Sequence, residues 1–252
     1  MAAVNSRTSS RLSFLAARQR GAALLLMLAL VGLGAASLLM QGIGRADLDA
    51  RPQRLSAHAL RDAKEALIGY AVAHGRLPRP ALPGGRGSEF DGHCNDEQSC
   101  TGLLPWVTLG LAPGDGYGKL LRYSVTAQLT SAPVRPTLAV GTKAVVTRRD
   151  AELVYLAGAP ECTMGSRCAA AVVLSMGRDN GGISLQGVAQ AGASTTNLDE
   201  RANAGASATF MARPLNRDAR SRGGEYDDQL VWVPFEILLN RMSLAGKLPR
   251  NE

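Results

Sequence analysis

Aromatic and histidine side chains are scarce in this sequence of 252 residues. Phe, Trp and Tyr together make up 4% of the chain, and the only histidines are His58, His74 and His93, whose spacing matches no metal-binding motif. There is no Gly-x-Ser-x-Gly motif, and Gly118-Lys119 lacks the residues that complete a phosphate-binding loop. We therefore predict that the protein is not an enzyme; a membrane-tethered enzyme with an unfamiliar active site is the alternative.

Acidic residues are absent from the start of the chain, where none occurs before Asp47. The formal net charge of +7 would permit binding to nucleic acid or acidic lipid. However, the sequence contains no aromatic and basic motif of the known nucleic-acid-binding kinds, and part of the basic excess lies among the first twenty residues. We predict no nucleic-acid partner.

A long charge-free stretch runs from Gly21 to Met40. At about 1.5 Å per residue it matches a bilayer core of about 30 Å, so it predicts a transmembrane helix in contact with membrane lipid. Basic residues precede it, which predicts a cytoplasmic N-terminus and a periplasmic C-terminal part. We therefore expect a single-pass protein that is located in a bacterial inner membrane.

The same stretch has an alternative interpretation as a cleaved secretory signal peptide. Gly34-Ala35-Ala36 ahead of Ser37 provides the small residues of such a cleavage site. The product would be an exported binding protein, either secreted or membrane-anchored.

The four cysteines form two local pairs, each with five residues between its members. The expected disulfides are Cys94 with Cys100 and Cys162 with Cys168, because zinc ligands are usually spaced more tightly and an exported chain meets an oxidising compartment. Pairing across the two loops and a four-cysteine metal site are alternatives.

The remaining pattern predicts an α+β head. Apolar residues recur at helical spacing between Leu55 and Tyr70, and Gly75 and Pro78 follow as a helix stop. Strands are expected at 120–125, 137–146, 153–156, 170–176 and 229–233. Pro234 should open a short last helix, while residues 177–224 lack periodicity and are expected to cross the surface without a core of their own.

Three segments carry a resemblance to a known family. Arg18-Gln19-Arg20-Gly21 before the apolar run resembles the leader site that prepilin peptidase cuts after glycine. The segments 114–123 and 227–232 resemble a head turn and a C-terminal strand of pseudopilins. The chain therefore resembles type IV pilin-like proteins, the pseudopilins and minor pilins of type II secretion systems and type IV pili.

This resemblance implies the processing and the partners of the chain. The peptidase would cut between Gly21 and Ala22 and methylate the new N-terminus, and the mature chain would join other pilin-like subunits at an inner-membrane assembly platform. Most pilins place glutamate at the fifth mature residue, which here is Leu26. Because it lacks this glutamate, the chain resembles the tip or accessory subunits of the family.

The expected domains follow from these points. Residues 1–21 form a basic leader, 22–44 the transmembrane segment, 45–75 its amphipathic continuation and 76–252 the head. The predicted fold class is α+β: a long N-terminal transmembrane helix packed on a head that has an antiparallel sheet and a short C-terminal helix.

Asp227 and Asp228 carry the only metal hypothesis. Two adjacent carboxylates beside a flexible loop could hold Ca²⁺, which prefers oxygen ligands, and some pseudopilins bind calcium in a similar loop. The alternative is that both side chains are solvated or pair with Arg220 or Arg222. No other cofactor is expected.

Overall fold

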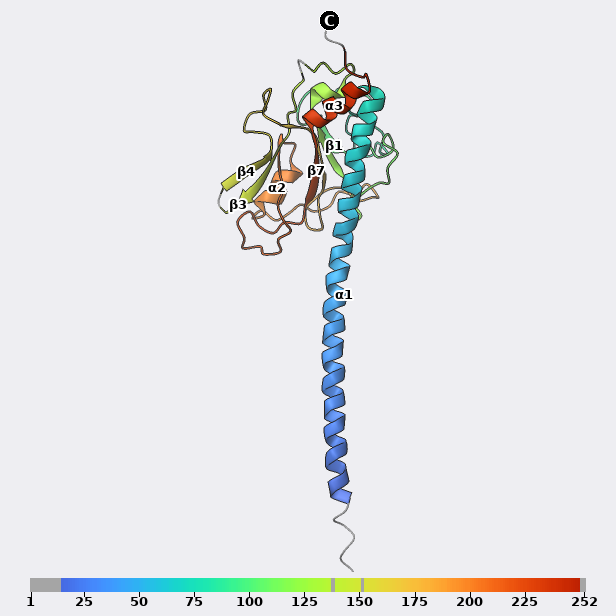
Figure 1. Cartoon of the computed structure of the whole chain (residues 1–252), viewed down its shortest axis with the longest axis vertical. Helices are drawn as coiled ribbons and strands as arrows, with labels where there is room; N and C mark the ends of the chain where they lie inside the picture. Colours follow the sequence, from blue (N-terminus) through green and yellow to red (C-terminus); the bar gives the residue numbers. More distant parts are fainter. Residues whose placement is uncertain (1–14, 137–138, 151, 250–252) are drawn as a thin grey trace, which may run out of the picture. The chain divides into compact units, whose positions relative to one another are not determined.

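The computed structural model describes residues 15–136, 139–150 and 152–249. It divides the chain into two compact units, residues 1–50 and 51–252, and each is described here by itself. Helix α1, Leu15–His74, begins in the first unit and ends in the second (Figure 1). Its side chains are described at residues 23–35 and from residue 50 onward. Most of the expected leader, residues 1–14, lies outside the described residues.

The expected transmembrane helix is not found. Within the part of the chain that the structure describes, no helix has the length and apolar character that crossing a bilayer requires. The described apolar side chains of the first unit run from Ala23 to Ala35, about 20 Å of helix at ~1.5 Å per residue, against a bilayer core of about 30 Å. The predicted fold class is therefore wrong in its transmembrane element, and the predicted single-pass inner-membrane location with a periplasmic head is wrong with it.

The second unit is α+β and contains two sheets. An antiparallel sheet of order β1-β2-β5-β7 is formed by Thr101–Leu103, Arg122–Val125, Ala169–Ser175 and Gln229–Pro234. A smaller sheet of order β4-β3-β6 is formed by Glu152–Ala157, Ala144–Arg149 and Thr209–Met211, with β3 and β6 parallel. The expected strands at 120–125, 153–156, 170–176 and 229–233 thus correspond to β2, β4, β5 and β7, whereas the one expected at 137–146 begins only at Ala144.

The short helices are η1 (Ala127–Thr130), α2 (Leu198–Ala204) and α3 (Phe235–Leu244). Helix α3 is the expected last helix. Pro234 takes its N-cap position, Glu236 lies in the first turn and Gly246 follows the end with a positive φ of 65°. These are ordinary start and stop signals, so local sequence explains the bounds of α3.

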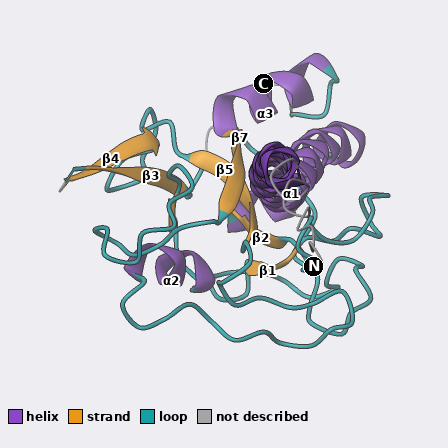
Figure 2. Cartoon of the chain, turned by 90° about the horizontal axis from the view of Figure 1, so that it is seen from below, coloured by secondary structure: helices purple, strands orange, loops and turns teal. Residues whose placement is uncertain are grey.

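The larger sheet is covered on both faces (Figure 2). Side chains alternate along a strand, so Tyr123 and Val173 face one side and Val172 and Leu174 the other. The first side packs on the C-terminal part of α1 and on α3, and the second packs on Phe210 and the smaller sheet. All seven residues of β5 are buried as a result, as expected of a strand covered on both faces.

The turn at residues 114–119, which carried part of the family resemblance, joins the head to its own part of α1. The N–H of Gly116 donates to Ser56 Oγ on α1 at 3.0 Å, and a Cβ added at Gly116 would meet the Pro52 carbonyl oxygen at 2.1 Å. Asp115 Oδ1 accepts the N–H groups of Tyr117 and Lys119. Only glycine allows the backbone of this turn to approach the helix so closely.

Residues 177–224 are not the coreless surface crossing that their composition predicts. They contain α2 and β6, and Asp199, Glu200, Asn203 and Phe210 among them are each at most 1% exposed. Hydrogen-bonding side chains, which carry no apolar periodicity, join α2 to β6 and to the residues before β7.

Candidate functional site

Asp227 and Asp228 lie just before β7, and their side chains have different environments. Successive residues of an extended chain point to opposite sides. Asp228 is 4% exposed and faces the interior, while Asp227 is half-buried and lines a surface cavity. The expected pair of neighbouring carboxylates is therefore split between two environments.

Asp228 is a buried link between separate parts of the head. Its Oδ2 accepts hydrogen bonds from Nδ2 of Asn203 on α2 at 2.9 Å and from Nδ2 of Asn180 at 3.1 Å. Asn180 also donates to the Glu200 carbonyl oxygen at 2.8 Å. Burial raises the pKa of Asp228 well above its ordinary value. This side chain joins α2, the loop after β5 and the start of β7.

Glu200 lies in the first turn of α2, which Asn197 caps. Asn197 Oδ1 accepts the Glu200 N–H, and its Nδ2 donates to Glu200 Oε2 at 2.6 Å, while the Asp227 N–H donates to Oε1 at 2.8 Å. Burial and, to a lesser extent, the charge of Asp227 raise the pKa of Glu200 to about 7. Burial also raises the pKa of Asp227. In both carboxyl groups, burial therefore favours the protonated form.

One oxygen of Asp227 has no hydrogen-bond partner. Its Oδ2 accepts the Arg178 N–H at 2.7 Å, whereas Oδ1 is buried and unpaired. Ligand atoms of Glu200, Asp227 and Asp228 lie within 4.8 Å of one another, beside a cavity of about 180 Å³. Both oxygens of Glu200 accept hydrogen bonds, and both of Asp228 face amide donors, so Asp227 is the residue that best fits a hard cation. Calcium binding stays a prediction, and titration of wild type and Asp227→Asn with Ca²⁺ would test it.

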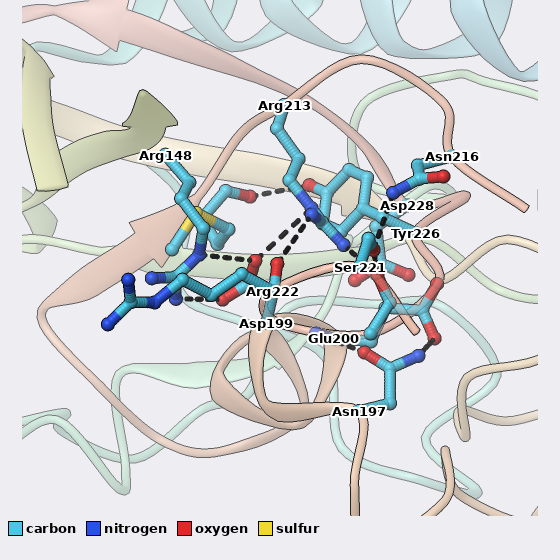
Figure 3. A network of polar contacts seen from close by, with 12 residues as sticks. Arg148, Asn197, Asp199, Glu200, Arg213, Asn216, Ser221, Arg222, Tyr226 and Asp228 are labelled. Atoms are coloured by element: carbon cyan, nitrogen blue, oxygen red, sulfur yellow. Dashed lines mark hydrogen bonds and ion pairs between the residues drawn. The ribbon is translucent and has the colours of Figure 1, made fainter. Parts of the chain in front are cut away.

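Another buried carboxylate, Asp199, carries the arginine contacts of this region (Figure 3). Arg148 on β3 donates to both of its oxygens, from Nη2 at 2.6 Å and from Nε at 3.1 Å, and Arg213 Nε lies 3.2 Å from Oδ2. The expected alternative partners Arg220 and Arg222 form no ion pair with Asp227 or Asp228 in the described part of the chain. Asp199 therefore forms an ion pair between α2 and the smaller sheet, with Arg148 on β3.

The other predicted residues lie away from this cluster. Both expected disulfides are present, Cys94–Cys100 and Cys162–Cys168, so the cross-loop pairing and the four-cysteine metal site do not occur. Leu26 lies on α1 and is 62% exposed. Gly21 and Ala22, the expected processing site, lie in a part of α1 whose side chains are outside the described ones.

Sequence reasoning missed Glu200, Asn180 and Asn203. A signal for α2 was available: Asn197 is followed three residues later by Glu200, the spacing of a capping box. Nothing local pointed to the two asparagines, because their partner is distant in the sequence. No protein-family model, no curated protein and no solved structure matches this chain.

Proposed function

We propose that this protein is a non-enzymatic, pilin-like assembly subunit of the pseudopilin or minor-pilin kind, which packs against other pilin-like subunits through the first part of α1. The supporting observation is the exposure of large apolar side chains there. Eight of them are 61–72% exposed: Leu24, Leu25, Leu26, Met27, Leu28, Leu30, Val31 and Leu33. Exposed apolar surface of this extent supports the proposal, because contact with a partner would remove it from water.

The arrangement of these side chains favours several neighbours over one. Consecutive helical residues are about 100° apart, so the five residues from Leu24 to Leu28 surround the helix axis. A single partner helix covers only one side. A helix that is apolar all round fits a bundle in which sister helices surround it, as in the core of a filament.

The resemblance of Arg20-Gly21-Ala22 to a leader site completes the proposal. Prepilin peptidase would cut after Gly21 and methylate Ala22, and the assembly platform of a secretion system or pilus would then incorporate the subunit. Mass spectrometry of the chain produced together with a prepilin peptidase should find N-methylated Ala22. A chain that begins near Ser37 would instead support the secretory signal-peptide alternative.

Cysteine cross-linking tests the helix contact directly. All four natural cysteines are in disulfides, so a single introduced cysteine is the only free thiol. The variant Leu28→Cys, produced with its neighbouring pilin-like subunits, should cross-link to one of them through a thiol-specific reagent. The matched control is Leu244→Cys on α3, where the leucine is 82% exposed but belongs to the head. No cross-link from Leu28→Cys, or equal cross-linking from Leu244→Cys, would contradict the proposal.

The position of the subunit in the assembly is tested by Leu26→Glu. A tip subunit has no neighbour above it whose N-terminal amine could pair with the new carboxylate, so we expect lower incorporation. Leu26 is exposed, so the head should keep its thermal stability. Improved incorporation along the filament would identify an ordinary body subunit.

A further inference from the structure

Arg122 on β2 lies on the sheet face that points away from α1. Its register partners are Leu103 on β1 and Leu174 on β5, and these belong to two different apolar clusters. The Arg122 side chain therefore lies between the two clusters. Strand alternation explains the position, since the neighbouring Tyr123 is buried in the main core on the other face.

The guanidinium of Arg122 has no acidic partner among the described residues. Nη2 donates to the Gly205 carbonyl oxygen at 3.0 Å, and Nε is buried without an acceptor. Burial lowers the pKa of Arg122, and no charged neighbour offsets it. Arg122 is half-buried, and a cation that is partly removed from water is stabilised by an anionic partner.

Arg122 lines a large cavity. It has a volume of about 700 Å³, within the range of about 300–1,000 Å³ that is usual for small-molecule sites. Its walls are mainly apolar, and two of the wall side chains, Leu82 and Phe90, are 49% and 36% exposed. Arg122 is the only charged side chain among the lining residues. The cavity therefore offers one positive charge in an apolar space.

We propose that this cavity binds a small amphiphile with one carboxylate on an apolar body, with the carboxylate at Arg122 and the body along Leu82, Phe90 and Leu103. A guanidinium matches a carboxylate in charge and in hydrogen-bonding geometry. One cation balances one negative charge, which favours a carboxylate over a phosphate dianion. None of the residues that line this cavity belongs to α1, so the inference does not depend on the assembly proposal.

Binding of decanoate to the full chain at pH 8 tests the proposal. Equilibrium dialysis should show a saturable site in wild type that decanol, of the same chain length but uncharged, occupies at least tenfold more weakly. In Arg122→Gln the decanoate affinity should fall at least tenfold. Any decanoate on the exposed part of α1 is the same in both proteins, so the difference between them reports the cavity.

Two further variants separate loss of the site from loss of the fold. Arg149→Gln removes the same charge from an exposed position on β3 and should bind decanoate like wild type. Ala206→Phe adds bulk at an exposed cavity residue while keeping Arg122, and it should also abolish binding. Equal affinity for decanoate and decanol, or unchanged binding in Arg122→Gln or in Ala206→Phe, would overturn the proposal. Preference for decyl phosphate over decanoate would also overturn it.

Discussion

Asn203 on α2 donates a hydrogen bond from Nδ2 to Oδ2 of Asp228, 25 residues later in the chain, over 2.9 Å. The same asparagine accepts the Met211 N–H at 2.8 Å and donates to the Met211 carbonyl oxygen at 3.0 Å. One fully buried side chain thus connects α2, β6 and the start of β7. A segment with little apolar periodicity depends on this contact for its position.

Replacement of Asn203 should destabilise the head strongly. Asn203→Ala leaves the buried Met211 N–H without a partner and removes one hydrogen-bond donor each from the Met211 carbonyl oxygen and from Asp228 Oδ2, so we expect a loss of about 2–3 kcal/mol in the free energy of unfolding. Chemical denaturation measures it. Asn240→Ala on the exposed side of α3 is the control and should change stability by less than about 0.5 kcal/mol. Similar losses in both variants would show that Asn203 is not a link.

Glu200 should make the head less stable as the pH rises from about 4.5 to about 7. Its pKa is raised from 4.5 to about 7 in the folded protein, so the folded state holds a proton that the unfolded state releases. The stabilisation that this bound proton gives to the folded state is on the order of 3 kcal/mol. It is fully present below about pH 4.5 and is lost by about pH 7.

The variant Glu200→Gln checks this pH dependence. It cannot titrate, so its stability curve should be flatter than that of wild type between pH 4.5 and pH 7, whatever its absolute stability. Urea denaturation at four or five pH values in this window gives both curves. If the stability of both proteins changes with pH in parallel, a group other than Glu200 binds the proton.

Gly116 should tolerate no side chain. In Gly116→Ala the new Cβ would meet the backbone of Pro52, which cannot move aside as a flexible side chain could. We expect a loss of at least about 2 kcal/mol and a lower melting temperature. At Gly192 an added Cβ meets nothing within 4 Å, so Gly192→Ala is the matched control and should melt like wild type. If Gly116→Ala also melts like wild type, the turn is not held against α1.

The two disulfides should differ in their contribution to stability although their loops are equal. Both close a sequence separation of 6, so the chain-entropy effect is the same, about 2 kcal/mol. Cys94 and Cys100 are 3% and 1% exposed and belong to the main core, whereas Cys162 is only half-buried. The double variant Cys94→Ser/Cys100→Ser should therefore melt lower than Cys162→Ser/Cys168→Ser, because its hydroxyls are buried among apolar side chains. The reverse order in calorimetry would contradict this assignment.

Local sequence by itself determined those elements whose signals lie within a few residues. The last helix has Pro234 at its start and Gly246 after its end, and β5 is a run of small and β-branched apolar residues. The matched spacing of the cysteines was likewise enough to predict both disulfides. In each case the physical cause, a cap, a buried strand or a short loop, is local.

Tertiary structure decided the rest. The apolar run in α1 looked long enough to cross a bilayer, but no described helix meets that requirement. The opposite roles of Asp227 and Asp228 depend on which side of β7 each faces. Asn180 and Asn203 are distant in sequence from the Asp228 carboxylate that they contact, and Glu200 is distant from the Asp227 N–H that it accepts. Arg122 lacks an acidic partner only because of what surrounds β2. Such contacts join residues tens of positions apart, and no local pattern encodes them.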